Sequence, residues 1–309
     1  MLATLVVFLV SLLALTNAAS SVSKIHELFV KHYPGGKEAL NQALHERADW
    51  SPLPNFENLG ATKNRERDTV WGVGWARFDS MGPVIQCPKD ILEVFGTDDE
   101  EKRICGAIKD DDCVVISLGS NNQWEFEEAV IKHHPQCKIH TFDCYVRGLN
   151  VPAAIRSQVT GHKYCIGTTD HTTPQGNEYL TWRSIVQKIG LTKSPTAMKM
   201  DIEGGEWMTI PAIIKSGLHV PESFTFELHY ETEIKDLKWA FRPRTDPEIG
   251  LFMELLFNLG YVLVDRHDNP HCRHCTEIVV SKLLPNTRFP HHFRSDSYAV
   301  GNSTRARPN

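Results

Sequence analysis

Residues 113–143 read CVVISLGSNNQWEFEEAVIKHHPQCKIHTFD, and their pattern is that of a strand, a turn, a helix and a second strand. The run from Cys113 to Leu118 is apolar apart from one serine, which is typical of a strand buried on both faces. A polar turn, Gly119 to Asn122, separates it from an amphipathic helical segment at Trp124 to His133. A second apolar run, Cys137 to Phe142, completes the unit. Strand–helix–strand units form parallel sheets, so this stretch predicts an α/β fold.

The same alternation continues toward the C-terminus. Thr181 precedes an apolar helical stripe that ends at Gly190, and Asp246 caps a helix that has proline at its first position. Another helix is expected from Glu206 to Ser216. The remaining strands are expected at His162 to Ile166, Thr196 to Ile202, Ser223 to Leu228, Tyr261 to Val264 and Ile278 to Leu283, the last two as a hairpin. This order predicts a doubly wound, mostly parallel sheet.

The region before this domain has a different pattern. Residues 20–109 read as short helices and loops, with one helix capped by Ser23 and a second at Lys37 to Arg47. Trp71 and Trp75 flank flexible glycines, and we favour packing on the main domain over a substrate lid for this motif. We therefore expect a helical N-terminal region packed on a main domain at residues 110–284, followed by a polar basic tail at residues 285–309.

The N-terminal segment predicts the compartment. It carries no charged side chain through residue 19, and its apolar run is shorter than the roughly 20 residues that cross a bilayer. We interpret residues 1–19 as a signal peptide cleaved after Ala18 or Ala19, with an uncleaved anchor as the alternative. The sequon at Asn302 is then a glycosylation site. We expect the mature protein in the lumen of the secretory pathway or outside the cell, without a transmembrane span.

Eight cysteines follow this segment, an even number that suits disulfide bonds in an oxidising compartment. The preferred pair is Cys87 with Cys105, which flank an expected helix. A buried thiol is weighed equally with a bridge for the cysteines in apolar runs, which are Cys113, Cys137 and Cys165. The segment His267 to Cys275 resembles a zinc ligand set, but disulfide bonds of Cys272 and Cys275 are favoured over a metal.

Composition excludes several classes of protein. The chain has 309 residues, of which 41% are hydrophobic and 23% charged, values typical of a folded globular protein. The net charge of −5 offers no basic excess to neutralise a phosphate backbone, so we expect no nucleic-acid partner. The sequence contains no internal repeat of the kind that builds solenoids or propellers.

Ligands of doubly wound sheets bind beyond the carboxyl ends of the strands. The first strand ends in a turn with a single glycine, Gly119, whereas a pyrophosphate needs several glycines for close backbone approach. The sequence also lacks a phosphate-binding P-loop. These features favour a nucleoside ligand without a pyrophosphate. Asp143, after the second strand, is placed to accept hydrogen bonds from two ribose hydroxyls, or it is a turn residue.

Four segments in this order resemble the class I S-adenosylmethionine-dependent methyltransferases: Val114 to Asn121, Thr141 to Asp143, Met198 to Trp207 and Phe226 to Leu228. Within that class the chain is similar to the FkbM-like group and to animal methyltransferase-like proteins of the secretory pathway, over residues 70–283. The most specific segment is Lys199-Met-Asp-Ile-Glu-Gly-Gly-Glu206. The resemblance implies a Rossmann-like, seven-stranded sheet with an antiparallel last strand, and S-adenosyl-L-methionine as the cofactor.

The resemblance also implies a set of cofactor-binding residues, which are Gly119, Asn121, Asp143, Thr169 and Asp170. Gly119 and Asn121 match the turn that passes the methionine portion of the donor. Asp143 matches the acid that binds the ribose. The last two residues of the set lie in the region that contacts adenine in the family.

Two positions of the first turn depart from the family pattern. Ser117 replaces the usual acid, and Gln123 replaces a glycine. Glu125 or Glu127 is a candidate to supply the missing charge. A catalytically inactive, secreted binding protein on the same fold is therefore the alternative to an enzyme.

Asp201, Glu203 and His229 are the candidate catalytic residues, because they lie at the ends of the fourth and fifth expected strands. The resemblance implies that Asp201 and Glu203 face the transferred methyl group or the acceptor. Methyl transfer needs alignment above all, and a carboxylate or imidazole serves as a base when the acceptor is a hydroxyl. Glu227 is a further candidate base. As alternatives, Glu203 and Glu206 cap the next helix, or the three candidates hold a hard divalent ion; we favour a site without metal. We expect O-methylation of a glycan, lipid or small-molecule hydroxyl.

Overall fold

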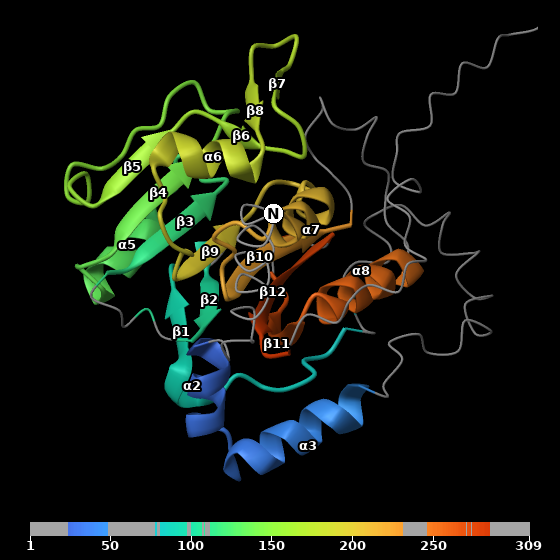
Figure 1. Cartoon of the computed structure of the whole chain (residues 1–309). Helices are drawn as coiled ribbons and strands as arrows, with labels where there is room; N and C mark the ends of the chain where they lie inside the picture. The colour runs from blue at the N-terminus through green and yellow to red at the C-terminus, as the bar shows by residue number, and fades with distance from the viewer. Residues whose placement is uncertain are drawn as a thin grey trace, which may run out of the picture.

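The computed structural model describes residues 24–48, 78, 81–97, 100–106, 108, 112–230, 246–269, 271–272 and 274–284. Its centre is a seven-stranded sheet in the order β11-β12-β10-β9-β3-β4-β5 (Figure 1). The strands are β3 (Val114–Leu118), β4 (Lys138–Phe142), β5 (Val159–His162), β9 (Ala197–Met200), β10 (Ser223–His229), β11 (Tyr261–His267) and β12 (Cys275–Lys282). β12 is antiparallel to both neighbours, and the other adjacent pairs are parallel. The predicted seven-stranded, mostly parallel sheet with an antiparallel last strand is confirmed.

The strand order reverses between β3 and β9. From β3 the chain proceeds outward to β4 and β5, and it then returns to place β9 on the other side of β3. The register pairs Leu118 with both Phe142 and Met200, so the three strands end at the same edge of the sheet. Ligands of doubly wound sheets bind at such a reversal. The loops after β3, β4 and β9 are therefore the place where a site is expected.

One face of the sheet is covered by α6 (Trp182–Ile189), α7 (Glu206–Ser216) and α8 (Asp246–Asn258) (Figure 1). The helices and strands share one large apolar core, which includes Ile116, Met198, Phe226, Ile185, Ile213 and Phe252. The predicted boundaries of α6 and α7 are confirmed. Thr181 caps α6 by accepting a hydrogen bond from the Ser184 N–H, and Gly190 and Gly217 end α6 and α7 in the left-handed conformation.

The opposite face is covered by α5 (Glu125–His133) and by N-terminal elements. α5 shares a core with a hairpin of β1 (Leu92–Phe95) and β2 (Lys102–Cys105), through residues that include Phe126, Val130, Phe95 and Ile104. Helices α2 (Lys24–His32) and α3 (Gly36–Ala48) share a core with β11 and β12, formed by Ile25, Phe29, Leu40, Leu44, Val262, Val264 and Val279. The N-terminal elements thus bury the apolar side of β11 and β12 that α8, on the other face, leaves uncovered.

The segment between Cys87 and Cys105 differs from the sequence expectation. The predicted helix is wrong, because the segment holds a short 3-10 helix (Lys89–Ile91) and the antiparallel pair β1–β2. Each of these strands has only four residues. A pattern of that length does not separate a strand from a helix by periodicity.

The third predicted strand is divided between two sheets. The expected strand at His162 to Ile166 is wrong: β5 ends at His162, and β6 (Cys165–Ile166) pairs with β8 (Glu178–Leu180) in a small sheet that also contains β7 (His171–Thr172). A hydrogen bond of 2.9 Å from the Tyr164 N–H to the His162 carbonyl turns the chain between them. β5 is an edge strand with exposed residues, so no continuous apolar run marks it.

Four disulfide bonds join the eight cysteines: Cys87–Cys105, Cys113–Cys137, Cys144–Cys165 and Cys272–Cys275. The first and the last confirm the sequence-based preferences. The second links the start of β3 to the start of β4, and the third links the loop after β4 to β6. The cysteines in apolar runs are therefore bridged rather than free, as is typical of proteins in oxidising compartments.

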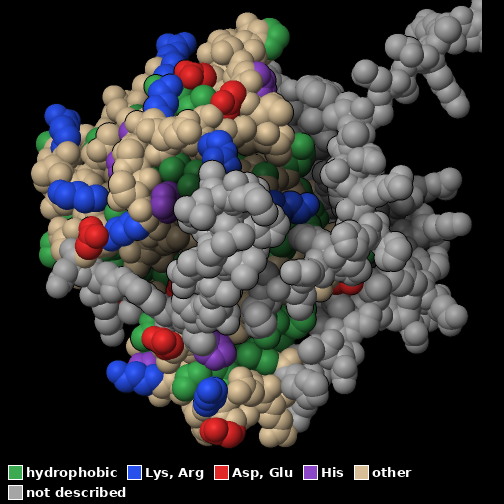
Figure 2. All heavy atoms as spheres, in the orientation of Figure 1, with side chains coloured by type: hydrophobic (Ala, Val, Ile, Leu, Met, Phe, Trp, Pro, Cys, Tyr) green, Lys and Arg blue, Asp and Glu red, His purple; other side chains and the backbone are tan. Residues whose placement is uncertain are grey.

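Several sequence predictions lie outside the described residues: the signal peptide at residues 1–19, the Trp71 to Trp75 motif, the sequon at Asn302 and the tail at residues 285–309. Among the described helices, none combines the length and the apolar character needed to cross a bilayer. On the face in Figure 2, Lys and Arg side chains stand singly or in small groups among other side chains rather than in one continuous band.

Candidate active site

The loops after β3 and β9 meet where the strand order reverses. Gly119 has φ +78°, and a Cβ atom at this residue would lie 1.7 Å from the carbonyl oxygen of Asp201. The Asp201 N–H donates to the Leu118 carbonyl at 2.9 Å, and the Gly119 N–H donates to the Phe142 carbonyl at 2.9 Å. Glycine is needed here both for its conformation and for the backbone contact. The predicted donor turn and the predicted catalytic residues are therefore adjacent.

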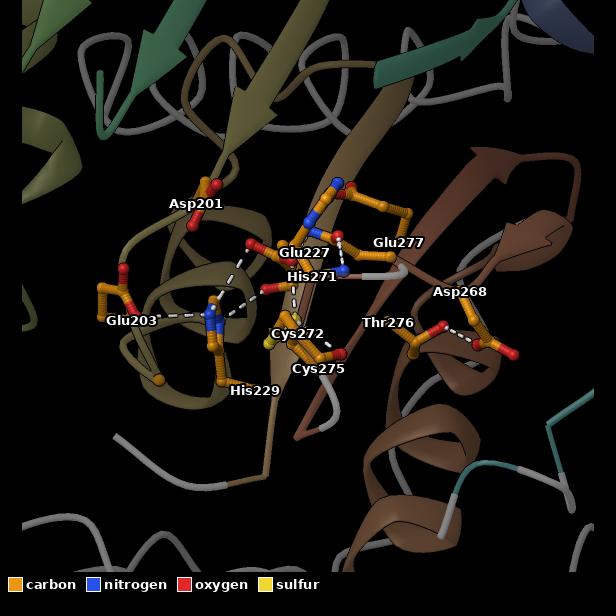
Figure 3. Close-up of a disulfide and its surroundings, with 12 residues drawn as sticks. Asp201, Glu203, Glu227, His229, Asp268, His271, Cys272, Cys275, Thr276 and Glu277 are labelled. Atoms are coloured by element: carbon orange, nitrogen blue, oxygen red, sulfur yellow. Dashed lines mark hydrogen bonds and ion pairs between the residues drawn. A yellow bond between two sulfur atoms is a disulfide. The ribbon is translucent and has the colours of Figure 1, made fainter. Parts of the chain in front are cut away.

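The turn between β9 and α7 is sharp. Glu203 and Gly204 have φ +57° and +100°, a region that residues other than glycine rarely adopt. The Glu206 carboxylate holds the turn by accepting hydrogen bonds from the Ile202 N–H at 2.8 Å and the Gly204 N–H at 2.9 Å. Of the two acids that the sequence offers as caps, Glu206 binds the turn. The carboxylate of Glu203 is directed to His229 instead (Figure 3).

His229, at the end of β10, is 2% exposed and lies among acids. Its Nδ1 is 3.2 Å from the carbonyl oxygen of Glu227 and 3.7 Å from Oε1 of Glu206. Its Nε2 is 3.3 Å from Oε2 of Glu203 and 3.6 Å from Oε2 of Glu227. One nitrogen or oxygen atom each of Asp201, Glu203 and His229 lies within 4.8 Å of the other two (Figure 3). The structure thus brings the three candidate catalytic residues together.

Two buried lysines balance part of this negative charge. Nζ of Lys102, in β2, lies 2.5 Å from Oε1 of Glu277 and 3.6 Å from Oδ2 of Asp201. Lys199, in β9, donates a hydrogen bond to the carbonyl of Gly119. The sequence offers a signal for only one of these lysines. Lys199 lies within an apolar strand, and a lysine is buried only when it is paired. Lys102 follows four acidic residues in a charged run, which is typical of an exposed segment.

Burial and charge act on the pKa values of the site in opposite directions. Burial raises the pKa of Asp201, but Lys102 and Lys199 outweigh it and the pKa falls to about 2. Burial raises the pKa of Glu227, and the charge of Asp201 raises it further. Burial likewise raises the pKa of Glu277 to about 7, against the opposing effect of Lys102. Asp201 is therefore a fixed negative charge at neutral pH.

A buried carboxyl group lies next to the position where Ser117 replaces the usual acid. Ser117 stands between Thr141 on β4 and Lys199 on β9. Glu127, which is 1% exposed, accepts a hydrogen bond of 2.9 Å from the Thr141 hydroxyl. Burial raises the pKa of Glu127 by more than the charge of Lys199 lowers it, so the pKa is raised overall. Of the two acids considered from the sequence, Glu127 lies beside Ser117 and Glu125 is exposed, and the supply of the missing charge stays a prediction.

Asp143 follows β4, as the sequence predicts, and its carboxylate contacts the turn after β3. Its Oδ2 accepts hydrogen bonds from the N–H groups of Ser120 at 3.2 Å and Asn121 at 2.8 Å. Its Oδ1 accepts from the N–H groups of Tyr145 at 2.8 Å and Val146 at 3.3 Å. The carboxylate therefore fastens the turn after β3 to the loop after β4. Ribose hydroxyls bound at this position would share its oxygens with the backbone.

The two residues assigned to adenine have local partners. Asp170 accepts hydrogen bonds from the Thr181 N–H and the Ser184 hydroxyl, both at 2.5 Å, and these bonds lower its pKa. They attach the loop after β6 to the first turn of α6. Thr169 contacts its own loop. Among the described residues, Thr169 and Asp170 are therefore not joined to Asp143 by a direct contact, and their role toward adenine stays a prediction.

A family model described as a methyltransferase domain matches residues 56–282. The chain belongs to this methyltransferase family. The matched segment contains the whole seven-stranded sheet and every predicted site residue. The protein is thus a methyltransferase. S-adenosyl-L-methionine is the methyl donor that the sequence resemblance implies. The finer resemblance to FkbM-like and animal secretory proteins stays a prediction.

Solved structures show a weaker likeness. A fibrillarin pre-rRNA processing protein of Methanococcus jannaschii is 12% identical with a TM-score of 0.39, over 59% of this chain and 71% of its own. An Aeropyrum pernix fibrillarin with natively bound S-adenosyl-L-methionine is 11% identical with a TM-score of 0.36, over 56% and 67%. A Planctomyces limnophilus O-methyltransferase family 2 protein, in complex with apigenin, is 12% identical with a TM-score of 0.32, over 78% and 65%. No curated protein matches the chain.

The side chains at the place where the strand order reverses are chemically suited to bind the methyl donor. The donor carries a positive sulfonium centre and a ribose with two hydroxyls. Asp201 contacts Gly119 through its backbone carbonyl, and its ionised carboxylate is a negative charge that attracts a cation. The Asp143 carboxylate offers hydrogen-bond acceptors one strand away. The donor would be held by the Gly119 to Asn122 turn and by Asp143.

Proposed function

We propose that this methyltransferase transfers the methyl group to a hydroxyl of a glycan, a lipid or a small molecule in the secretory pathway. The observation that carries the proposal is the grouping of Asp201, Glu203 and His229 beside the Gly119 turn. S-adenosyl-L-methionine supplies an activated methyl group, so the protein mainly aligns the acceptor. A hydroxyl acceptor must also lose a proton, and a carboxylate beside the acceptor suits that need.

The three residues form the acceptor subsite. Asp201 is held ionised by Lys102 and can accept a hydrogen bond from the acceptor hydroxyl. The Glu203 side chain is 43% exposed and gives the subsite access to solvent. His229 is buried behind it, with its ring oriented by the Glu227 carbonyl. Burial lowers the pKa of His229, but the hydrogen bond to Glu206 and the charges of Glu206, Glu227 and Glu203 raise it well above its usual range. Glu203 is therefore the group placed to take the proton of the hydroxyl, and the His229 ring positions it.

The proposed compartment is supported by the apolar first 19 residues and by the four disulfide bonds. Both are typical of proteins that enter the secretory pathway. Hydroxyl acceptors in that compartment include glycans and lipids, which is why the proposal names these classes.

The substitution Asp143→Asn is expected to weaken the binding of S-adenosylhomocysteine about 10-fold to 100-fold. The reason is that a hydrogen bond to a charged group contributes about 1.5–3 kcal/mol. Isothermal titration calorimetry on the oxidised protein measures the affinity. Asp112→Asn is the control, because the Asp112 carboxylate is exposed and pairs with Lys193 away from the sheet edge.

Two outcomes would contradict this part of the proposal. Equal affinities of the Asp143→Asn and Asp112→Asn variants would remove the ribose-binding role of Asp143. Failure of the unmodified protein to bind S-adenosylhomocysteine would favour the alternative of a secreted binding protein that has lost the donor site. The four backbone hydrogen bonds at Asp143 are the observation that makes this second outcome worth testing.

The substitution Glu203→Gln is expected to lower the rate of methyl transfer at least about 100-fold, while the affinity for the donor stays the same. The Glu203 side chain faces the acceptor subsite and not Asp143. Its substitution should therefore change the rate of transfer without changing the affinity for the donor. Transfer of a labelled methyl group to a panel of glycans, lipids and small alcohols measures the rate. Preference for amine or thiol acceptors over hydroxyls in this panel would contradict O-methylation.

A further inference from the structure

We infer that the ends of β9 and β10 form a divalent-cation site, with Asp201, Glu203 and His229 as its ligands. Each residue offers one ligand atom, and the three atoms lie within 4.8 Å of one another. Nε2 of His229 and Oε2 of Glu203 are 3.3 Å apart. Neighbouring ligands around a six-coordinate ion with bonds of about 2.1–2.4 Å are separated by about 3.0–3.4 Å. The spacing of Glu203 and His229 is thus that of two neighbouring ligands of one ion, and Asp201 lies within reach of the same ion.

The orientation of the His229 ring suits the site. Its Nδ1 faces the Glu227 carbonyl at 3.2 Å and the Glu206 carboxylate at 3.7 Å. Its Nε2 is buried from water and faces Oε2 of Glu203 at 3.3 Å and Oε2 of Glu227 at 3.6 Å. Metal-binding histidines are oriented in this way, by a carbonyl or carboxylate on the other ring nitrogen.

The charge balance of the site points in the same direction. Glu206 uses both of its oxygens on backbone N–H groups, and Glu277 pairs with Lys102. Asp201 shares Lys102 at the longer distance of 3.6 Å, while Glu203 and Glu227 face His229. Asp201 and Glu203 thus lie close together beside His229, where two carboxylates attract a divalent cation. The half-exposed Glu203 gives such an ion a path from solvent.

The state of the cysteines selects the class of ion. Glu227, His229, Cys272 and Cys275 form an overlapping group whose ligand-type atoms also lie within 4.8 Å of one another. Cys272 and Cys275 are joined in a disulfide bond, so they offer no thiolate. Carboxylate oxygens with one imidazole then favour Mn²⁺, Mg²⁺ or Ca²⁺ over Zn²⁺. The inference deepens the proposed function and rests on it in one respect: with an ion bound, the three residues act on the acceptor hydroxyl through the ion.

A Mn²⁺ titration tests the site without any methyl transfer. The oxidised, metal-free protein is titrated without donor or reductant, and electron paramagnetic resonance measures the free Mn²⁺. We expect one Mn²⁺ per chain and at least about 10-fold weaker binding for Glu203→Gln. Glu178→Gln is the matched control, because the Glu178 side chain is also 43% exposed but lies on β8 and pairs with Lys188. It should bind Mn²⁺ like the unmodified protein.

Each outcome of this titration supports or overturns the site. Absence of Mn²⁺ binding by the unmodified protein would overturn the inference and leave His229 as a protonated partner of the acids. Equally weakened Mn²⁺ binding in Glu203→Gln and Glu178→Gln would show that the ion binds at another place and would overturn the inference. Failure of the donor to bind, measured by calorimetry, would contradict the proposed function. The cation site would still be supported in that case if Glu203→Gln weakens Mn²⁺ binding. Donor binding without Mn²⁺ binding would overturn the cation site and leave the proposed function in place.

Discussion

Replacing Gly119 with alanine is expected to lower the free energy of unfolding by about 4 kcal/mol or more. The new Cβ atom would lie 1.7 Å from the Asp201 carbonyl oxygen, and the residue would have to keep φ +78°. The loops after β3 and β9 would therefore have to separate. Their separation would break the hydrogen bonds that bring the two strands to the same edge, and donor binding should be lost with it. Urea unfolding of the oxidised protein measures the stability.

Gly176→Ala is the control for this substitution. Gly176 has a similar φ of +89°, but a Cβ atom there would meet nothing within 4 Å. Only the left-handed conformation then costs energy, about 1–2 kcal/mol. The difference between the two variants isolates the backbone contact of Gly119 with Asp201. Equal losses in both would show that this contact does not hold the two loops together.

The fold was largely predictable because its signals are local. Thr181, Gly190 and Gly217 predicted helix boundaries, since caps and left-handed stops act on backbone groups within the same turn. The seven-stranded topology came from the resemblance rather than from periodicity. The β1–β2 hairpin and the placement of β5 were not predictable, because these strands have four residues each and β5 lies at an exposed edge.

The sequence predicted where in the fold the site lies, but it did not predict which groups the side chains of the site contact. Parallel strands end at one edge, so Asp143, Asp201 and His229 could be assigned to the same region from their positions after strands. What each side chain binds depends on distant residues and on backbone geometry. Glu203 and Glu206 are three positions apart, and the positive φ of Glu203 is what directs it to His229 while Glu206 caps the turn. No local sequence pattern indicates which of the two glutamates caps the turn and which contacts His229.

Replacing Lys102 with methionine is expected to lower the free energy of unfolding by about 3–5 kcal/mol. The lysine side chain is fully buried, and its partners Glu277 and Asp201 would be left without it. Methionine has a similar length, so the loss comes mainly from charge. Lys188→Met is the control, because its pair with Glu178 is at the surface and contributes about 0–1 kcal/mol. Urea unfolding at neutral pH compares the two variants.

The double variant Lys102→Met, Glu277→Gln tests the electrostatic origin of this loss. Glutamine removes one of the two charges that the single variant leaves uncompensated, so the double variant should regain a substantial part of the stability. If it is no more stable than Lys102→Met, the packing of the lysine stem accounts for the effect instead. Lys102 belongs to β2, and its partners belong to β12 and to the loop after β9. A loss of the expected size would therefore mean that the N-terminal hairpin and the methyltransferase sheet fold as one unit, held together at the acceptor subsite itself.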